Sequence, residues 1–149
     1  MQPHPLDPND MLCFDVYTLQ QAFGRIYKPL LDPLGLTYPQ YLVMVLLWQG
    51  HPVTVGQIGA RLGLDSSTLT PVIKRLEKAG LVRRDRDAQD ERRVLVTPTR
   101  EGREMQRRAA AVPGCVAAAT GMSEAHISAL RDQIAGLRAA LRAASDRAG

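Results

Sequence analysis

The fold of this chain is decided by the stretch Thr54-Val-Gly-Gln-Ile-Gly-Ala-Arg-Leu-Gly-Leu-Asp-Ser-Ser-Thr-Leu-Thr-Pro-Val-Ile-Lys-Arg-Leu-Glu-Lys-Ala-Gly80. Thr54 is a good N-cap for a short helix, and Gly63 stops that helix. Asp65 opens a second helix, which Gly80 ends as the residue just beyond its C-terminus. Two short helices joined by a few residues that include Gly are typical of a helix-turn-helix.

Two predicted strands follow this stretch, Leu81–Arg84 and Arg93–Thr97, and the charged segment between them, Asp85–Arg92, is too polar to be core. A hairpin with a charged tip directly after a helix-turn-helix is typical of a winged helix. The sequence therefore predicts a mainly α-helical fold with a small β-hairpin wing.

The second helix separates an apolar face from a polar one. Leu69, Val72, Ile73 and Leu76 follow the i, i+3, i+4, i+7 spacing of a buried face. The outward face then carries Ser66, Ser67, Thr68, Thr70, Pro71, Lys74, Arg75 and Lys78. Hydroxyls at a helix N-terminus and cations further along suit contacts with DNA phosphates and base edges. An ordinary solvated face or a protein-contact module is the alternative. Pro71 is expected to kink the helix or delay its start.

The predicted wing carries nearly balanced charge. Its cations are Arg83, Arg84, Arg86, Arg92 and Arg93, and its carboxylates are Asp85, Asp87, Asp90 and Glu91. Arginines held by carboxylates can enter a minor groove, and Arg86 and Arg92 are the candidates. The alternative is a salt-bridged hairpin without a role in DNA binding.

Helices are predicted on both sides of this winged lobe, which spans residues 50–98. An apolar stripe predicts a first helix from Asp10, capped by Asn9 or Asp10, that ends or kinks near Lys28 because Pro29 follows. Another helix, capped by Thr37, spans residues 40–48. Thr99 and Ser123 cap two more, with a break near residues 113–114. Residues 1–9 are expected to be a disordered tail, and residues 10–48 and 99–149 to form dimerisation helices within a single domain.

Composition narrows the class of protein. The chain has 149 residues, a formal net charge of +4 and two cysteines. Its mild basic excess is compatible with nucleic acid. It shows no apolar run of membrane-spanning length and no signal peptide, so a cytoplasmic protein with reduced thiols is expected. The scattered histidines show no metal-ligand spacing, and no cofactor motif is found.

Cys13 is a candidate reactive thiol, because the first turn of a helix favours negative charge on sulfur. Tyr17 lies one turn further on. Tyr27 lies about 21 Å from Cys13 along a straight helix, so it cannot touch Cys13 of its own chain. A second chain packed antiparallel would bring its Cys13 within reach of Tyr27, and the same packing would bring Tyr38 within reach too. The alternative is that these tyrosines pack an interface and that Cys13 is a small buried hydrophobe. Cys115, in the predicted break, is a candidate mobile thiol or a small packing residue.

The chain resembles the MarR family of dimeric winged-helix regulators. The resemblance rests on Thr54-Val-Gly-Gln-Ile-Gly59, Leu64-Asp-Ser-Ser-Thr-Leu-Thr-Pro71, Lys74-Arg-Leu-Glu-Lys-Ala-Gly-Leu81 and Asp90-Glu-Arg-Arg-Val-Leu-Val96. Within that family it is similar to the organic-hydroperoxide-sensing repressors, in the segments Leu12-Cys-Phe14, Tyr27-Lys-Pro-Leu-Leu-Asp32 and Gly35-Leu-Thr-Tyr-Pro-Gln-Tyr-Leu42. The likeness covers about residues 10 to 116.

The resemblance implies roles for particular residues. An organic peroxide would oxidise Cys13, whose thiolate would be held by Tyr27 and Tyr38 of the partner subunit, with Tyr17 as a third tyrosine of the site. In the two-cysteine subgroup an intersubunit disulfide follows, for which Cys115 is the candidate. The minor-groove arginine falls on Arg92. Pro98 departs from the family pattern and is expected to shorten the second wing strand.

The expected function is therefore that of a homodimeric repressor, not an enzyme, that binds a pseudo-palindromic DNA operator and is released by organic hydroperoxides. It needs no cofactor and no membrane. Two other functions remain open, namely a MarR-type repressor released by a small aromatic ligand and a thiol peroxidase.

Overall fold

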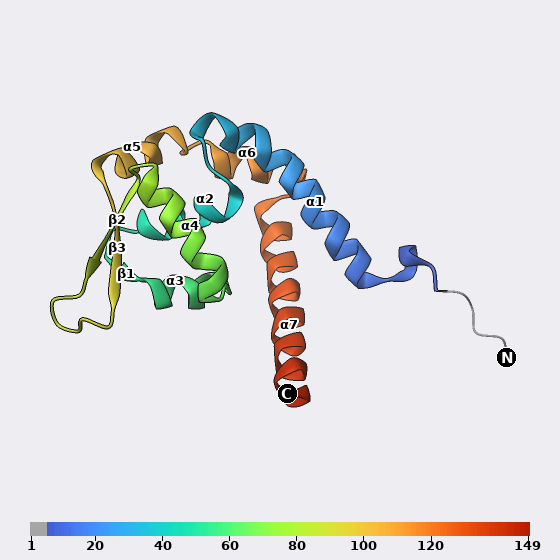
Figure 1. Ribbon diagram of the computed structural model, residues 1–149. Coiled ribbons are helices and arrows are strands. Elements are labelled where there is room, and N and C mark those ends of the chain that lie inside the picture. The colour runs from blue at the N-terminus through green and yellow to red at the C-terminus, as the bar shows by residue number, and fades with distance from the viewer. Residues whose placement is uncertain (1–5) are drawn as a thin grey trace. The chain divides into compact units, whose positions relative to one another are not determined.

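A computed structural model describes residues 6–149 of the chain, which divide into two units, 6–112 and 113–149. Figure 1 shows the elements in chain order. They are the short 3-10 helices Pro8–Asp10 and Asp32–Leu34, the helices α1 (Leu12–Leu31), α2 (Tyr38–Leu47), α3 (Val55–Leu62), α4 (Ser66–Lys78), α5 (Arg100–Arg108), α6 (Val112–Ala119) and α7 (Glu124–Ala148), and the strands β1 (Val53–Thr54), β2 (Val82–Arg86) and β3 (Val94–Pro98). Residues 1–5 of the expected tail lie outside the described residues.

The helix-turn-helix is formed by α3 and α4, as predicted. Thr54 and Gln57 make a reciprocal capping box at the start of α3. Asp65 Oδ1 accepts a 2.8 Å hydrogen bond from the Thr68 amide and so caps α4. Gly63 has a φ of +67° between the two helices, a conformation that favours glycine. These hydrogen bonds fix the turn between α3 and α4, and with it the direction in which the outer face of α4 points.

The core of the first unit lies between α2, α3, α4 and the sheet. The four apolar residues predicted to face inward from α4 are all buried. They pack with the apolar middle of α2 and with Ile58 of α3, both also buried. Burying a side chain of this size contributes about 1.5–3 kcal/mol, so this packing holds α4 firmly against the rest of the lobe.

The sheet has three strands in the order β1-β3-β2, and both pairings are antiparallel. The predicted hairpin is present, but β1 was missed because two residues are too short to show an alternating pattern. Strand β3 runs through Pro98, which is opposite Val82, so the expected shortening at Pro98 is wrong. Pro98 is the last residue of β3, a position where a missing N–H does little harm.

Two further expectations about prolines each named two outcomes, of which the structure excludes one. Helix α1 continues past Pro29 to Leu31 instead of ending near Lys28. Helix α4 begins directly after Asp65 although Pro71 lies inside it, so its start is not delayed. The reason is the Asp65 cap, which fixes the first turn regardless of Pro71.

The helix starts outside the lobe agree only partly with the sequence. Thr99 caps α5 and Ser123 caps α7, as predicted. At the N-terminus, however, Met11 is the N-cap of α1, because Asn9 and Asp10 are taken up by the 3-10 helix before it. The predicted break near residues 113–114 is also misplaced. It covers residues 109–111, and α6 has already begun at Val112.

Within residues 6–149 no single helix is long and apolar enough to cross a membrane. Only one bent pair, Leu12–Leu34 with Tyr38–Leu47, passes that test, by length and composition alone.

Candidate redox-sensing site and nucleic-acid interface

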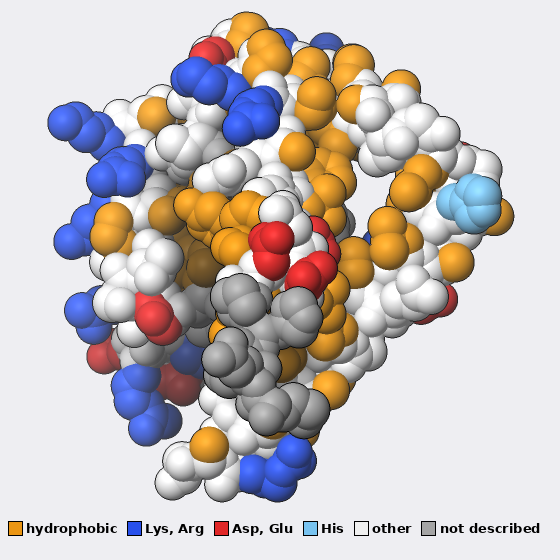
Figure 2. All heavy atoms as spheres, turned by 90° about the vertical axis from the view of Figure 1, so that its right-hand side faces the viewer, with side chains coloured by type: hydrophobic (Ala, Val, Ile, Leu, Met, Phe, Trp, Pro, Cys, Tyr) orange, Lys and Arg blue, Asp and Glu red, His pale blue; other side chains and the backbone are white. Residues whose placement is uncertain are grey.

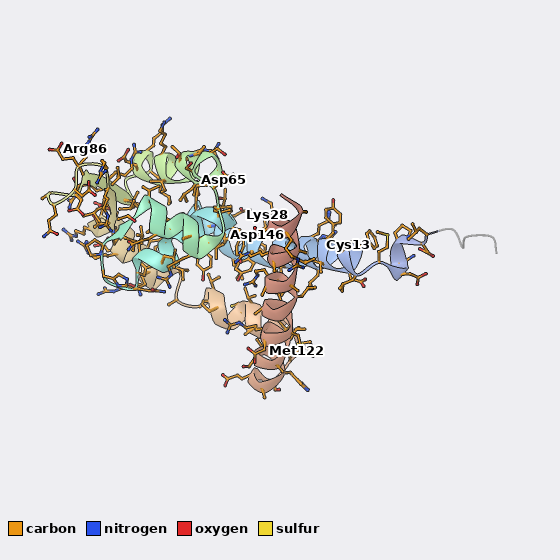
Figure 3. All side chains as sticks on the ribbon, turned by 90° about the horizontal axis from the view of Figure 1, so that it is seen from below. Cys13, Lys28, Asp65, Arg86, Met122 and Asp146 are labelled. Carbon is orange, nitrogen blue, oxygen red and sulfur yellow. The ribbon has the colours of Figure 1, made fainter. Side chains whose placement is uncertain are left out.

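Cys13 is the second residue of α1 and is an exposed free thiol. The unpaired backbone N–H groups of the first helical turn favour negative charge there. Helix α1 runs unbroken from Cys13 past Tyr27, so the two residues are about 21 Å apart along its axis. Figure 3 shows this separation, with Cys13 at one end of α1 and Lys28 towards the other. Tyr27 therefore cannot serve Cys13 of its own chain.

Tyr27 and Tyr38 form a close pair. Their ring centroids are 4.7 Å apart and their planes are inclined by 50°. Tyr27 lies in the last part of α1 and Tyr38 is the first residue of α2, whose start is fixed by a capping box between Thr37 and Gln40. Tyr38 is exposed, so the pair presents phenol groups at the surface. The structure thus brings together two of the tyrosines that the sequence singled out.

The environment of Tyr27 keeps its hydroxyl protonated. Burial, followed by the nearby Tyr38 and Tyr41, raises the pKa of Tyr27 from 10.0 to about 12. A phenol that stays neutral near pH 7 is a hydrogen-bond donor. The Tyr27 end of the pair can therefore donate to an anionic sulfur.

Sequence reasoning missed two aromatic residues behind this pair. The ring of Tyr41 lies 6.0 Å from that of Tyr27, and Trp48 lies 6.3 Å beyond Tyr41. The Trp48 Nε1–H donates a 2.8 Å hydrogen bond to the Gly102 carbonyl of α5. The available signal was the presence of Tyr38, Tyr41 and Trp48 on or directly after one apolar helix, in a chain with few aromatics.

The remaining candidates of the thiol site are placed separately. Tyr17 is exposed and lies one helical turn after Cys13, as predicted. Cys115 is an exposed free thiol that lies inside α6, in the second unit, not in a flexible break. The expected mobility of Cys115 therefore loses its basis.

The outer face of α4 carries the predicted polar residues. All are exposed except Thr70, which is half-buried. The exposed candidates are Ser66, Ser67, Thr68, Lys74, Arg75 and Lys78. The Ser67 hydroxyl also donates a 2.6 Å hydrogen bond to the capping carboxylate of Asp65. This bond is the largest of the interactions that lower the pKa of Asp65. The polar face is thus solvent-accessible and fixed in register by the cap.

The wing arginines divide into structural and exposed groups. Arg84 forms a two-pronged ion pair with Glu77 of α4, at 2.9 and 3.2 Å, and its hydrogen bonds lower the pKa of Glu77. This pair ties the wing to α4. Arg86 and Arg92 are exposed, and Arg92 Nε lies 3.2 Å from Asp90 Oδ1. Figure 3 shows Arg86 and Cys13 at opposite ends of the first unit, residues 6–112.

Two helices leave apolar stripes uncovered. Five aliphatic or phenylalanine side chains of α1, each 39% to 61% exposed, recur every three or four positions, and they are Leu12, Val16, Leu19, Phe23 and Ile26. On α7 the same spacing joins the exposed residues Leu130, Ile134, Leu137 and Leu141. Figure 2, turned so that the right-hand side of Figure 1 faces the viewer, shows many hydrophobic side chains at the surface. Alternating spacings of three and four residues are typical of a helix that packs against another helix.

No group of three or more His, Cys, Asp or Glu side chains that could hold a metal ion occurs among the described residues.

Comparisons with known proteins agree with this fold. The model of the MarR family matches residues 36–94. The HTH-type transcriptional regulator TtmR of Methylorubrum extorquens (strain PA1) is 47% identical over 141 residues, which cover 95% of this chain and 71% of that protein. The organic hydroperoxide resistance transcriptional regulator of Bacillus subtilis (strain 168) is 45% identical over 107 residues, which cover 72% and 73%.

Solved structures of AbfR from Staphylococcus epidermidis are also similar. Reduced AbfR bound to DNA has a TM-score of 0.74 and 32% identity, with 87% of this chain and 91% of that chain covered. Disulfide-formed AbfR has a TM-score of 0.61 and 35% identity, with 85% and 88% covered.

The fold and these relatives define a winged helix-turn-helix transcriptional regulator. More particularly, the chain belongs to the MarR family, in its organic hydroperoxide resistance regulator subgroup. The fold class and family predicted from the sequence are confirmed.

Proposed function

We propose that this protein is a homodimeric, DNA-binding repressor in the cytoplasm that organic hydroperoxides release through oxidation of Cys13. The observation that carries the proposal is the pairing of half-buried Tyr27 with exposed Tyr38, where Tyr27 lies about 21 Å along α1 from the thiol of its own chain. Two phenol groups at that position serve Cys13 only if a second subunit packs antiparallel along α1. The sensing site is then shared between two subunits.

The exposed stripes supply the surface for that second subunit. Residues 10–48 and 99–149 act as dimerisation segments, with the stripes of α1 and α7 buried against the other copy. Leaving so many large apolar side chains in water would be unfavourable, at about 25 cal/mol per Å² of exposed surface. A second copy of this chain carries the same pattern and is complementary to it.

The chemistry at Cys13 is nucleophilic attack on a peroxide. The thiolate attacks one oxygen of the hydroperoxide, the O–O bond breaks, and the sulfur becomes sulfenic acid while the leaving alkoxide takes a proton to become an alcohol. Tyr27 and Tyr38 of the other subunit hold the thiolate by hydrogen bonds and orient the peroxide. The thiol of Cys115 then attacks the sulfenic sulfur, giving a disulfide and water. AbfR, which also has a disulfide-formed state, is a precedent for such a bond in a similar chain.

DNA binding is assigned to the lobe at residues 50–98. The hydroxyl groups and cations on the outer face of α4 contact the major groove, and Arg86 and Arg92 contact the flanking minor groove. In a dimer the two α4 helices meet half-sites about one DNA turn apart. The structure of reduced AbfR bound to DNA supports DNA binding by a chain of similar fold. Oxidation changes the subunit packing and hence the distance between the two α4 helices.

The deciding experiment compares Cys13→Ser with the wild-type protein on a DNA duplex selected from random sequence by the reduced protein. Cys13→Ser is expected to bind the duplex as tightly as the wild type and to stay bound when cumene hydroperoxide releases the wild type. Gel shift or fluorescence anisotropy measures both. Release of Cys13→Ser at the wild-type peroxide dose would rule out the thiol mechanism.

Cys115→Ser separates the second chemical step from the first. This variant is expected to form sulfenic acid on Cys13, detected by dimedone labelling, but no disulfide-linked dimer on a non-reducing gel. A persisting covalent dimer would mean that Cys115 is not the second cysteine. Sustained peroxide consumption with a thiol reductant, beyond one equivalent per Cys13, would indicate a peroxidase instead of a regulator.

A further inference from the structure

A continuous row of aromatic side chains connects the tyrosine pair to the far end of α2. The row runs Tyr38, Tyr27, Tyr41 and Trp48, with successive ring centroids 4.7, 6.0 and 6.3 Å apart. Tyr41 is only 5% exposed and occupies the middle of the row. Protein interiors are packed so densely that a ring in such a row cannot move without displacing its neighbour.

The row ends in a hydrogen bond to another part of the fold. The Trp48 indole N–H donates to the Gly102 carbonyl at 2.8 Å, across 54 residues of sequence. Gly102 belongs to the first turn of α5 and is pressed against the backbone of Leu81. A Cβ atom placed on Gly102 would lie 2.1 Å from the Leu81 carbonyl oxygen. The first turn of α5 has no free space on its Leu81 side, so a movement of Trp48 displaces Gly102 and Leu81 together.

The first turn of α5 is in turn bonded to the junction between α4 and β2. The Thr99 amide donates to the Leu81 carbonyl at 3.0 Å, and the Thr99 hydroxyl donates to the Gly80 carbonyl at 2.6 Å. Gly80 and Leu81 are the residues where the recognition helix ends and the wing begins. The aromatic row thus leads, by contacts and hydrogen bonds, from the tyrosine pair to the base of both DNA-contacting elements.

We propose that Tyr41 and Trp48 are positioning residues that transmit a rearrangement of the Tyr27–Tyr38 pair to the α4–β2 junction. This inference rests on the proposed function, because it takes oxidation of the other subunit's Cys13 as the event that moves the pair. Oxidation adds an oxygen atom, or a disulfide, where the phenol groups had held a thiolate. Tyr27 then shifts, Tyr41 and Trp48 follow, and the hydrogen bond to Gly102 pulls on α5, so that α4 and the wing move in response.

Trp48 is the one tryptophan in the sequence, so it reports on its own environment. Peroxide is expected to change the fluorescence emission of the wild-type protein, and Cys13→Ser is expected to show no change. Tyr41→Leu, which interrupts the row, should abolish the change although Cys13 still becomes oxidised. Tyr41→Phe keeps the ring and should preserve it. An equal fluorescence change in Tyr41→Leu and wild type would overturn the proposal.

Trp48→Phe tests the last link, since it retains a ring but removes the donor to Gly102. The duplex affinity of each protein is measured reduced and fully oxidised. The ratio of the oxidised-form Kd to the reduced-form Kd is expected to be about fivefold smaller in Trp48→Phe than in wild type. A fivefold change corresponds to the loss of one net hydrogen bond. The matched control is Arg108→Gln, which removes a 2.9 Å hydrogen bond from the end of α5 to the Pro33 carbonyl, off the aromatic row. Its ratio should stay at the wild-type value.

These readouts distinguish failure of the inference from failure of the proposed function. If peroxide does not oxidise Cys13 or does not release wild-type protein from DNA, the proposed function fails. If wild type behaves as proposed but Trp48→Phe keeps the wild-type ratio of Kd values, Trp48 does not transmit the signal. Circular dichroism and the affinity of the reduced form show whether each variant is folded.

Discussion

The Tyr27 phenol is poised to donate a hydrogen bond over the whole physiological pH range. Its pKa lies at about 12 in the folded chain, against 10.0 without the fold, mainly because of burial. Since the folded-state pKa is raised, the stabilisation from burying the neutral phenol is fully present below about pH 10 and is lost as the pH rises through about 12. Near pH 7 the hydroxyl is therefore always a donor.

Tyr27→Phe removes that donor while keeping the ring in the aromatic row. Oxidation of Cys13 by cumene hydroperoxide is expected to slow by at least about tenfold, because a hydrogen bond to a charged group contributes roughly 1.5–3 kcal/mol. Stopped-flow measurement of sulfenic acid formation gives the rate. Tyr41→Phe is the control, since its hydroxyl lies one ring further from the surface, and its rate should equal that of wild type. Equal rates for Tyr27→Phe and wild type would exclude a role for the Tyr27 hydroxyl.

Individual residues were predictable where the sequence carried a rigid spacing. The distance from Cys13 to Tyr27 follows from helical rise alone, and the structure keeps α1 unbroken between them. Tyr41 and Trp48 were not singled out, because inside a buried helix an aromatic gives the same hydrophobic pattern as any core residue. Their importance lies in contacts between elements, which a one-dimensional pattern does not contain.

At the scale of elements, the start of α5 depends on one close backbone approach. Gly102 lies against the Leu81 carbonyl and the Met44 side chain, so α5 and the strand that follows α4 meet without a side chain between them. This approach lets Trp48 and Thr99 hydrogen-bond to neighbouring segments. The position requires glycine for reasons of space.

Gly102→Ala is expected to destabilise the protein by at least about 2 kcal/mol, because the new Cβ would overlap a backbone oxygen that cannot rotate away. Chemical denaturation measures the loss. Gly56→Ala is the matched control in the same structural unit, where the Cβ would meet only the Thr54 hydroxyl at an ordinary 3.9 Å. That control should be as stable as wild type or slightly more so. A fully stable Gly102→Ala would mean that α5 does not dock in this way.

Capped helices were the most predictable elements, since caps depend on neighbouring residues. Thr37, Thr54, Asp65, Thr99 and Ser123 each cap the helix that was expected from them. Strand β1 escaped prediction because it exists only through its pairing with β3. The start of α1 was misplaced because Asp7 caps a short 3-10 turn that uses up the two favoured cap residues.

At the scale of the whole molecule, two helices carry apolar stripes that the rest of the described chain leaves exposed. The stripe of α1 follows the three-four spacing of a helix–helix seam and includes Phe23 as its fourth residue. A protein that contacts two DNA half-sites gains affinity from joining its two lobes, typically by a factor of about 10²–10⁴. Loss of the seam should therefore affect DNA binding as well as assembly.

Phe23→Glu places a carboxylate in the seam and is expected to convert the dimer to a monomer, because a charge there loses its water without gaining a partner. Light scattering after size-exclusion chromatography gives the mass. Affinity for the selected duplex should fall at least about 100-fold, since each lobe then binds alone. Gln21→Glu adds the same charge on the opposite face of α1 and should remain dimeric with nearly unchanged affinity. A Phe23→Glu protein that stays dimeric would place the subunit interface elsewhere, and Tyr27 would then no longer be shared with Cys13 of a second chain.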